Sequence, residues 1–460
     1  MDKRPNIVFC MCDQLRWAEV GCYGHPTIRT PAIDSLAARG VRFETAVSTN
    51  PICMPSRSSL LSGQYSRTCN GALANNDREL VQGGFVMAPW PASGRPTHPE
   101  TTLPESLRAA GYRTAAIGKW HLEPWPQDIG FDYSLIPAVQ HAHTGQVYSE
   151  NGGPPVGAPG YNVDFEADKV REFLVGQRDA TEPFFLYYNI SPPHMPLADA
   201  PDHYTRMYSR DDVIVRPNVN LSKPIKNWRE ECLTYLWDHR YYTHHFPYAE
   251  TMPRDDFDLL DLHAMYMGLT TWVDDTVARL LQALRDQGLD ENTIVIFTSD
   301  HGDNLGSHGL MSKGTFNDES IRVPLVIAGP GITRDQVCPQ VTSLLDLAPT
   351  MLELAGAKPP EHMQGRSVAP VLRGEAAPST DARAFIESEW HGIAIRTASH
   401  LVTIPWREKR VVADVPSSVF DLRADPFELN NLAGHEDDEA RALTNELRNW
   451  NSDTQWMSAK

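Results

Sequence analysis

The chain has 460 residues, of which 41% are apolar and 22% are charged, as is typical of a globular protein with a large core. Its 59 acidic and 41 basic residues give a net charge of -18. Nucleic acids and anionic membrane surfaces attract clustered lysine and arginine, so this balance argues against both as partners. An anionic substrate would have to be attracted locally, by a metal ion or by a few convergent basic side chains.

The chain begins with an apolar run that predicts a buried parallel strand. Residues 6–12 are almost all apolar and end abruptly at Asp13 and Gln14, and ligands bind at this edge of open α/β sheets. Cys10 and Cys12 lie inside the run, so we interpret both as core thiols of a reducing compartment. The first residues do not resemble a signal peptide and no stretch approaches the ~20 apolar residues of a membrane span, so we expect a cytoplasmic protein.

The next informative stretch is residues 53–63, which predict a short helix that begins near Cys53 and ends at Gly63. Unpaired amide groups and the helix dipole favour negative charge at such an N-terminus, and Arg57 adds a positive charge one turn later. The start of this helix, at Cys53, therefore suits a nucleophile that lies beside a bound anion. A bare Cys-x-x-x-Arg pattern, however, fits an inert buried cysteine at least as well.

Two further stretches place basic side chains after buried strands. Lys119 and His121 follow the apolar residues 114–117, and because they are two apart on an extended segment they can meet one ligand. The strand predicted at 182–190 leads into a loop in which prolines flank His194. Neighbouring prolines restrict the backbone, which suits a fixed proton donor.

A second buried strand, similar to the one at residues 6–12, is predicted at residues 293–299. It follows a long amphipathic helix predicted at 256–287. It ends in Asp300 and His301. Together with Asp13 and Gln14 these residues supply two carboxylates, an amide oxygen and an imidazole. A mainly oxygen donor set suits Ca²⁺, Mg²⁺ or Mn²⁺, and the imidazole favours Mn²⁺ slightly.

These motifs together resemble the sulfatase family of the alkaline phosphatase superfamily, the group of formylglycine-dependent arylsulfatases and phosphonate monoester hydrolases. The matching strings are Cys-x-Pro-Ser-Arg with a Leu-x-x-Gly ending at 53–63, Gly-Lys-x-His at 118–121, Thr-Ser-Asp-His-Gly-Asp at 298–303 and Asp-Pro-x-Glu-x-x-Asn-Leu at 425–432. The resemblance covers nearly the whole chain. It implies that a formylglycine-generating enzyme or an equivalent oxidises Cys53 to formylglycine, whose hydrated aldehyde is the nucleophile.

The resemblance also implies a role for each site residue. One divalent metal ion, Ca²⁺ or Mn²⁺, would be bound by Asp13, Gln14, Asp300, His301 and the modified Cys53. The sulfate would be bound by Lys119 and by Lys313, which lies in a His308 to Gly314 segment similar to the family's second lysine element, with Arg57 adding positive charge. His121 would orient or deprotonate the nucleophile and His194 would contact the leaving-group oxygen. Among Asn70, Asn75 and Asn76 we take Asn76 as the substrate-binding candidate, although turn chemistry explains any of the three.

The implied fold is α/β, with a large mixed and mostly parallel sheet sandwiched by helices. We expect a catalytic domain at 1–375 and a small C-terminal antiparallel sheet with one helix at 376–460. Within the first, the aromatic and His-rich residues 198–255 predict a specificity segment or an oligomer contact. Further predicted elements are one strand at 322–332, one capped helix at 342–356, strands at 384–389, 393–397, 400–404 and 418–422, and a helix at 437–450.

The first functional expectation is hydrolysis of sulfate monoesters, either aryl or small alkyl sulfates. Gln14 stands where sulfatases often carry a second aspartate, and this substitution resembles phosphonate monoester hydrolases. A phosphonate monoester or phosphodiester hydrolase is therefore the alternative, and we expect some promiscuity between these esters. A non-enzymatic anion-binding or metal-binding protein, in which Cys53 is never converted, is the third hypothesis. We also expect a homo-oligomer.

Overall fold

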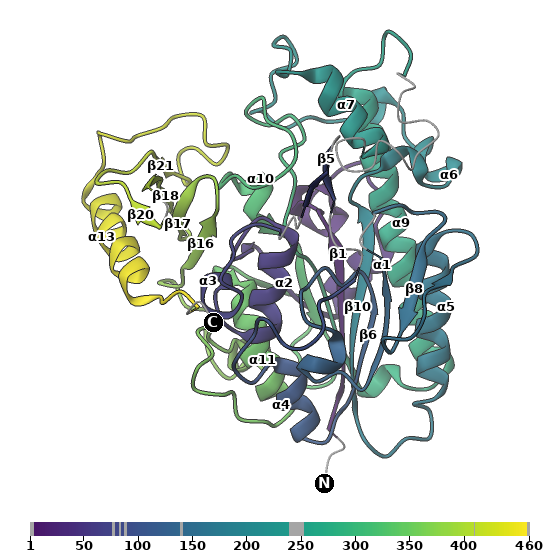
Figure 1. Ribbon diagram of the computed structural model, residues 1–460. Coiled ribbons are helices and arrows are strands. Elements are labelled where there is room, and N and C mark those ends of the chain that lie inside the picture. The colour runs from purple at the N-terminus through teal and green to yellow at the C-terminus, as the bar shows by residue number, and fades with distance from the viewer. Residues whose placement is uncertain are drawn as a thin grey trace.

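The computed structural model describes residues 4–75, 79–81, 84–86, 90–138, 141–238, 253–408 and 410–457. Its centre is a ten-stranded mixed sheet with the strand order β14-β2-β13-β11-β1-β10-β6-β7-β8-β9 (Figure 1). The strands β11, β1, β10, β6 and β7 run parallel, whereas β13, β8 and β9 pair in antiparallel fashion toward the two edges. The bounds are β1 (Asn6–Asp13), β2 (Gly40–Phe43), β6 (Arg113–Gly118), β7 (Tyr133–Pro137), β8 (Val147–Glu150), β9 (Val156–Gly157), β10 (Phe184–Pro193), β11 (Thr293–Ser299), β13 (Leu325–Ala328) and β14 (Gln336–Cys338).

Helices cover both faces of this sheet, which confirms the predicted α/β sandwich (Figure 1). One face packs against α1 (Pro31–Arg39), α5 (Asn162–Val175) and α9 (Leu259–Asp286), and the other against α2 (Cys53–Ser62), α4 (Leu103–Ala109), α11 (Leu347–Leu354) and α12 (Ala369–Leu372). Because β1 is buried on both faces, it reads as a continuous apolar run. No helix of the described residues is long and apolar enough to span a membrane.

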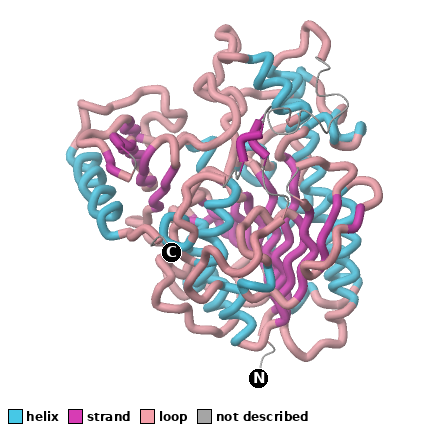
Figure 2. Tube along the Cα trace, in the orientation of Figure 1, coloured by secondary structure: helices cyan, strands magenta, loops and turns pink. Residues whose placement is uncertain are grey.

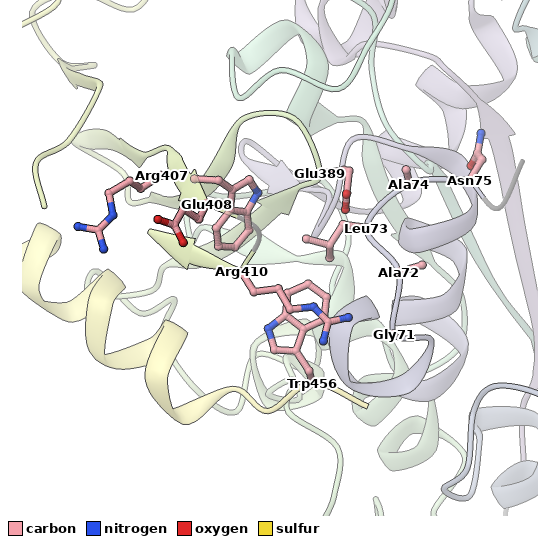
Figure 3. Close-up of a pocket in the computed structure, with 11 residues that line it drawn as sticks. Gly71, Ala72, Leu73, Ala74, Asn75, Glu389, Arg407, Glu408, Arg410 and Trp456 are labelled. Carbon is pink, nitrogen blue, oxygen red and sulfur yellow. The ribbon is translucent and has the colours of Figure 1, made fainter. Parts of the chain in front are cut away.

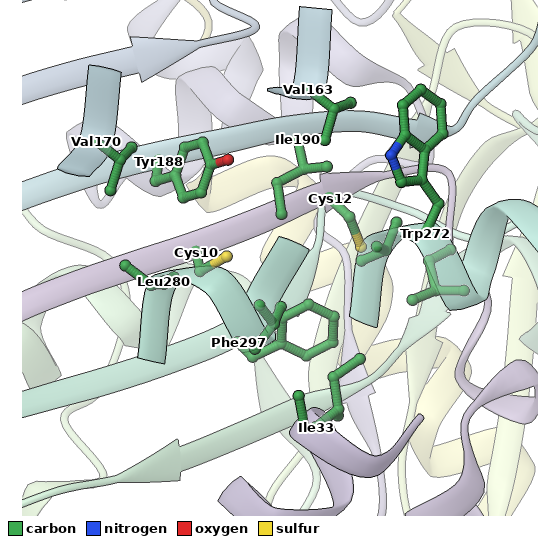
Figure 4. Packing of buried hydrophobic residues seen from close by; sticks show 14 of the residues in the cluster. Cys10, Cys12, Ile33, Val163, Val170, Tyr188, Ile190, Trp272, Leu280 and Phe297 are labelled. Atoms are coloured by element: carbon green, nitrogen blue, oxygen red, sulfur yellow. The ribbon is translucent and has the colours of Figure 1, made fainter. Parts of the chain in front are cut away.

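The core thiols lie where the sequence predicts them. Cys10 and Cys12 are fully buried among Ile33, Trp272 and Phe297, residues that α1, α9 and β11 contribute (Figure 4). Burial raises the pKa of the Cys10 thiol far above its usual range, so this thiol is neutral and acts as a small hydrophobic side chain.

The C-terminal part of the chain forms a separate four-stranded antiparallel sheet (Figure 2). Its strands are β16 (Ala384–Ser388), β17 (Gly392–Arg396), β18 (His400–Ile404) and β21 (Ser418–Asp421). The helix α13 (Asp438–Asp453) covers one face of this sheet. The other face packs against Val47, Phe316 and Ile321, which belong to the N-terminal part of the chain that forms the large sheet. The small antiparallel sheet with one helix is thereby confirmed, while the boundary at 375/376 stays a prediction.

Two predicted elements differ from the structure. The strand expected at 322–332 is interrupted at Pro324, which has no N–H to donate to a sheet. The residues before it form β12 (Arg322–Val323), which pairs with β3 (Ala46–Val47) outside the main sheet. The helix expected at 342–356 begins late, because Thr342 and Ser343 pair with β3 as β15 and the Ser343 side chain then caps a 3-10 turn before α11.

The remaining elements are short. Of the segment 198–255, residues 198–238 and 253–255 are described and consist mainly of loops with α6 (Asp202–Thr205) and α7 (Trp228–Trp237). Most of its His-rich tract, 239–252, lies outside the described residues, so its predicted role stays a prediction. The other short elements are α3 (Ser66–Cys69), β4 (Glu79–Val81), β5 (Gly84–Val86), α10 (Asp318–Ile321), β19 (Trp406–Glu408) and β20 (Val411–Val412).

Candidate active site

The adjacent parallel strands β1 and β11 bring their terminal polar residues together. The Asp300 backbone N–H donates to the Cys12 carbonyl across the two strands at 3.3 Å, and the Gln14 N–H donates to Asp300 Oδ1 at 3.1 Å. Asp13, Asp300 and His301 are all fully buried. Gln14 itself has a left-handed backbone with φ of 65°, a conformation that a non-glycine residue keeps only when its surroundings fix it.

The helix α2 delivers Cys53 to this cluster of ligand-type side chains. Its Sγ lies 3.2 Å from His301 Nε2 and 3.7 Å from Asp13 Oδ1. Asp13, Cys53, Asp300 and His301 place one ligand atom each within 4.8 Å of one another, and all four side chains are buried. The resemblance implies conversion of Cys53 to formylglycine, and a hydroxyl oxygen of its hydrate would then take the place of Sγ. Two carboxylates, an imidazole and that atom form a donor set that fits a divalent cation.

Arg57 is predicted to add positive charge for the bound sulfate, but its guanidinium contacts two carboxylates instead. Its fully buried guanidinium donates to Asp300 Oδ2 at 3.0 Å, to Asp13 Oδ2 at 3.1 Å and to Asn189 Oδ1 at 2.9 Å. The fork geometry of arginine suits this simultaneous contact with two carboxylates. Arg57 therefore holds the two carboxylates in place and balances their charge, rather than reaching toward a substrate anion.

Two lysines flank Cys53. Lys313 Nζ lies 3.0 Å from Cys53 Sγ, and Lys119 Nζ lies 2.5 Å from Asp13 Oδ2. Burial by itself raises the pKa of the Cys53 thiol, but Lys313, Lys119 and His301 together hold that pKa well below its usual range. The position therefore stabilises negative charge. We call Cys53, Lys119 and Lys313 the anion site.

The amide of Gln14 is engaged by neighbouring side chains. Its Oε1 accepts a hydrogen bond from Lys313 Nζ at 2.8 Å, and its Nε2 donates to Asp303 Oδ2 at 2.5 Å. Gln14 thus fixes the position of Lys313. Its predicted role as a metal ligand stays a prediction.

Both predicted histidines line the anion site. His121 follows β6 in a left-handed conformation with φ of 54°, and its ring lies close enough to Cys53 to lower the thiol pKa. His194 Nδ1 is 2.6 Å from the Met195 carbonyl, and because a carbonyl can only accept, Nδ1 carries the proton. Burial, then Lys313 and Lys119, lowers the pKa of His194 to about 4. A bound anion between the lysines would raise it.

The structure adds two residues that no motif indicated. His141 Nδ1 lies 3.1 Å from Asp238 Oδ2, and the His141 ring packs against the His194 ring with centroids 4.2 Å apart. Burial raises the pKa of Asp238 to about 8, although Lys119 and Lys313 act in the opposite direction. Asp238 belongs to the aromatic and His-rich tract that follows α7, which was the only sequence signal for it, and there was none for His141.

The asparagines that follow Cys53 in the chain differ in their contacts. Asn75 Oδ1 accepts a hydrogen bond from the Met54 N–H at 3.1 Å, which satisfies a donor at the N-terminus of α2. Asn70 is buried, and its amide has no hydrogen-bond partner among the residues that the structure describes. Asn76, the predicted substrate-binding candidate, lies outside the described residues.

A second group of ligand-type side chains among the described residues supports the Lys313 segment. His308 Nε2 lies 3.9 Å from Glu319 Oε2 and 3.8 Å from Glu428 Oε2. Arg216 Nε donates to Glu319 at 2.6 Å, and Glu428 accepts from the Asp318 N–H at 2.9 Å. Glu428 belongs to the C-terminal turn at 425–432, so this group connects the C-terminal sheet to the loop that carries Lys313.

A cavity of about 590 Å³ lies between residues 71–75 and the C-terminal sheet (Figure 3), and Cys53 is not among the residues that line it. Residues 71–75 form one wall and the C-terminal β19–β20 hairpin forms the other, with Arg410 and Trp456 between them (Figure 3). Arg410 stacks on the Trp456 ring at 4.1 Å. The cavity thus marks the junction between the C-terminal sheet and the segment that follows α2.

Comparison with known proteins agrees with this geometry. The sulfatase family model matches residues 5–357, and the model for the N-sulphoglucosamine sulphohydrolase C-terminal region matches residues 306–455. The chain is 31% identical over 464 residues to an ulvan-active sulfatase of Formosa agariphila, covering 96% of this chain and 80% of the relative. It is 30% identical over 475 residues to human arylsulfatase A, covering 94% of this chain and 83% of the relative.

Solved structures share the fold along almost the whole chain. One protein, solved in complex with its substrate D-glucosamine-2-N,6-O-disulfate, superposes with a TM-score of 0.75 at 27% identity and covers 98% of this chain and 97% of its own. The phosphonate monoester hydrolase of Agrobacterium radiobacter superposes with a TM-score of 0.70 at 23% identity and covers 98% of this chain and 95% of its own. The chain is a sulfuric ester hydrolase that belongs to the sulfatase family of the alkaline phosphatase superfamily.

Proposed function

We propose that the protein hydrolyses sulfate monoesters, aryl and small alkyl sulfates among them, with a formylglycine derived from Cys53 as the nucleophile. The observation that supports this most directly is the setting of Cys53. Its Sγ is 3.0 Å from Lys313 Nζ and 3.2 Å from His301 Nε2, within a buried group of metal-ligand side chains. A site that stabilises negative charge on residue 53 also suits the charge that a tetrahedral sulfuryl group carries when it binds there.

Asp13, Asp300, His301 and residue 53 would hold one divalent cation, with Gln14 as the further predicted ligand. The mixed oxygen and nitrogen donors fit Mn²⁺ or Ca²⁺. When bound, the cation lowers the pKa of a hydroxyl at residue 53 and polarises a substrate oxygen. Arg57 keeps both carboxylates in position whether or not substrate is present, because its contacts are with Asp13, Asp300 and Asn189.

The remaining residues act on charge and protons. The ammonium groups of Lys119 and Lys313 neutralise the nonbridging sulfuryl oxygens, the largest expected electrostatic contribution. His121 accepts a proton from the attacking hydroxyl. His194 keeps one proton on Nδ1 toward Met195, so Nε2 is the atom that takes up and then delivers a proton to the leaving alcohol. Each proton transfer contributes roughly 10²–10⁴-fold in rate.

The first experiment is mass spectrometry of the tryptic peptide that contains residue 53, combined with turnover of 4-nitrophenyl sulfate. We expect a mass that matches replacement of the thiol by an aldehyde, and we expect the Cys53→Ala variant to lose activity by at least ~10⁴-fold because the nucleophile is gone. An unmodified thiol in protein from the native host, together with no turnover, would favour the non-enzymatic anion-binding hypothesis instead.

A phosphonate monoester or phosphodiester hydrolase is the second candidate. The observation that favours it is Gln14, whose neutral amide contacts Lys313 where a second carboxylate would pair with that lysine. The test is the ratio of kcat/KM for 4-nitrophenyl sulfate to that for 4-nitrophenyl phenylphosphonate. A ratio above one supports the sulfatase proposal, and a ratio below one supports the alternative.

Three further proposals rest on the sequence. A formylglycine-generating enzyme or an equivalent would modify Cys53, the protein would act in the cytoplasm, and it would be a homo-oligomer. Coexpression with a modifying enzyme should raise the specific activity of recombinant protein in proportion to its formylglycine content. Sedimentation of the purified protein would measure its oligomeric state.

A further inference from the structure

A second group of metal-ligand side chains shares no residue with the candidate active site. It consists of His308, Glu319 and Glu428, which place one ligand atom each within 4.8 Å of one another. Glu319 and Glu428 are buried, whereas His308 is partly exposed. Solvent therefore reaches the group from the side of the imidazole.

The distances within this group are too long for hydrogen bonds and suit a shared ion. His308 Nε2 lies 3.9 Å from Glu319 Oε2 and 3.8 Å from Glu428 Oε2, whereas an N–H···O hydrogen bond spans about 2.7–3.2 Å. Two atoms that both lie ~2.0–2.4 Å from one ion are at most ~4.0–4.8 Å apart. One ion between the three side chains thus fits with little movement of any of them.

Glu319 has one oxygen that the protein leaves without a partner. Its Oε1 accepts hydrogen bonds from Arg216 Nε at 2.6 Å and from Asn218 Nδ2 at 2.8 Å. Its Oε2, which faces His308, has no hydrogen-bond partner among the described residues, although the side chain is only 2% exposed. Buried polar atoms in folded proteins are nearly always paired, so this oxygen indicates a bound ligand.

The imidazole of His308 has a lone pair available for that ligand. Asn218 Nδ2 lies 3.1 Å from His308 Nε2, but the same nitrogen lies 2.8 Å from Glu319 Oε1 and 3.2 Å from the Phe427 carbonyl oxygen. An amide carries two N–H groups, and these two oxygens accept both of them. Burial lowers the pKa of His308, which favours the neutral imidazole that binds metal ions.

Glu428 has no permanent positive charge beside it. Its two oxygens accept hydrogen bonds from uncharged donors, the Asp318 N–H at 2.9 Å and Asn317 Nδ2 at 2.6 Å. No lysine or arginine in the described part of the chain forms an ion pair with it. Burial, and then Asp318 and Glu319, raise the pKa of Glu428 well above its usual range. Without an ion this carboxyl carries a proton, which a bound metal ion displaces.

The three side chains come from segments that are far apart in the sequence. His308 lies in the Lys313 loop, residues 304–313, which the Asn304 N–H closes by donating to the Ser312 carbonyl at 2.7 Å. Glu319 belongs to α10 and Glu428 to the C-terminal turn at 425–432. An ion at this position would hold the Lys313 loop to the C-terminal part of the molecule.

We propose that His308, Glu319 and Glu428 form a second divalent-metal site, occupied by Zn²⁺, that fastens the Lys313 loop to the C-terminal turn. An imidazole and carboxylates are ligands that Zn²⁺ binds in proteins, whereas Ca²⁺ and Mg²⁺ prefer oxygen atoms alone. A water molecule on the exposed side of His308 would complete four-fold coordination. The inference goes beyond the proposed function, because this site takes no part in the hydrolysis of the ester.

The test counts the zinc ions that the full-length protein binds. Protein freed of metal by a chelator is titrated with Zn²⁺ in competition with a chromophoric chelator. We expect the wild type to bind one ion more per chain than either His308→Ala or Glu428→Gln, with a Kd below ~1 μM for that ion. Each variant should weaken this site by ~100-fold or more, because it removes one of three protein ligands.

Two further measurements do not depend on how well the ligand variants fold. Crystals of the wild type grown with Zn²⁺ should show an anomalous peak at the zinc edge, ~2.0–2.4 Å from the ligand atoms of His308, Glu319 and Glu428. Circular dichroism of each variant shows whether it is folded, and Glu428→Gln keeps the size and shape of the side chain.

His400→Ala is the matched control. His400 also faces two carboxylates, Asp437 at 3.6 Å and Glu439 at 3.4 Å, but it does so with different ring nitrogens. The two nitrogens of one imidazole point apart, so a single ion does not bind to both. The zinc count of His400→Ala should therefore equal that of the wild type.

Four outcomes would overturn the inference: the wild type binds no zinc ion below ~10 μM, His308→Ala or Glu428→Gln keeps the wild-type count while folded, His400→Ala also loses an ion, or the anomalous peak is absent. In each case the proton on Glu428 would suffice to balance the group. Because zinc is counted without turnover, the result is separate from the proposed function, which fails through the absence of hydrolysis of every sulfate ester.

Discussion

The side chain of Arg57 shows how a single residue can organise the whole site. The guanidinium is completely buried and contacts both carboxylates of the ligand group as well as Asn189. We expect Arg57→Lys to keep a positive charge but lose the fork that spans Asp13 and Asp300. Because such supporting contacts orient metal ligands, metal affinity and kcat should each fall by roughly 10–100-fold, measured by metal titration and by turnover of 4-nitrophenyl sulfate.

Asn189→Leu is the matched control for this prediction, since it removes one partner of Arg57 and leaves the contacts with both carboxylates. Its effect on metal affinity should be clearly smaller. If Arg57→Lys retained wild-type metal affinity, the proposed positioning role of Arg57 would be wrong.

Glu166 allows a prediction of how stability depends on pH. This carboxyl on α5 is fully buried, its Oε1 accepts a hydrogen bond from the Tyr148 hydroxyl at 2.6 Å, and burial raises its pKa to about 8 from an ordinary 4.5. A raised folded-state pKa gives stability that is fully present below pH ~4.5 and is lost as pH rises through about 8. Unfolding in urea should show wild-type protein losing a few kcal/mol relative to Glu166→Gln between pH 5 and pH 9. Parallel stability curves for the two proteins would contradict this.

At the residue scale, the sequence predicts those site residues that follow directly from a strand end or a helix start. Asp13, Asp300 and Cys53 belong to this class, because the direction of a buried strand or the N-terminus of a helix determines where the side chain goes. Asp238 and His141 could not be predicted in this way. They come from irregular segments, and only the folded chain brings them to His194. The contacts of Arg57 were also unpredictable, since its partners lie 44 and 243 positions away in the chain.

The strands β6 and β10 lie close together at Gly118, the residue before Lys119. Because Gly118 has no Cβ, the backbone of β10 can approach it closely. Gly118 has a φ of 92°, and a Cβ at this position would collide with the Asn189 carbonyl oxygen of β10. We expect Gly118→Ala to destabilise the protein by more than ~2 kcal/mol and to displace Lys119, with a lower Tm and a raised KM.

Gly24→Ala is a control for backbone conformation alone. Gly24 has a similar φ of 97°, but a Cβ there would have nothing within 4 Å. Its cost should be limited to roughly 1 kcal/mol for the left-handed conformation. Equal losses in the two variants would mean that the contact with Asn189 contributes nothing to the destabilisation.

Among the elements, long apolar strands and capped helices are predictable because local and tertiary preferences agree in them. The helix α4 is an example, because Thr102 and Glu105 form a capping box at its N-terminus. The predictions for the segments at 322–332 and 342–356 are wrong because local and tertiary preferences disagree there. Their apolar periodicity does not reveal that Pro324 interrupts one, or that pairing with β3 draws two residues of the other into a small sheet.

At the scale of the whole molecule, Arg67 joins the segment that follows α2 to the C-terminal sheet. It follows α2 in α3, its Nε lies 2.5 Å from Glu387 Oε2 of β16, and its guanidinium lies between the rings of Trp450 and Trp456 at 4.8 and 5.1 Å. Both charges of this pair are completely buried. The C-terminal sheet therefore packs against α3, the short helix that follows α2 in the chain.

Removing one member of such a pair leaves the other charge buried without its partner. We expect Arg67→Met, which keeps an apolar stem between the two tryptophan rings, to lower the free energy of unfolding by about 3–5 kcal/mol. The double variant Arg67→Met with Glu387→Gln should recover a large part of that loss, because no unpaired charge remains.

Urea unfolding of the wild type, both single variants and the double variant measures the coupling free energy between Arg67 and Glu387. Strictly additive losses would show that this pair does not connect the C-terminal sheet to α3. Since Arg67 lies in the segment directly after α2, we further expect kcat to fall in Arg67→Met and to return in the double variant in step with stability.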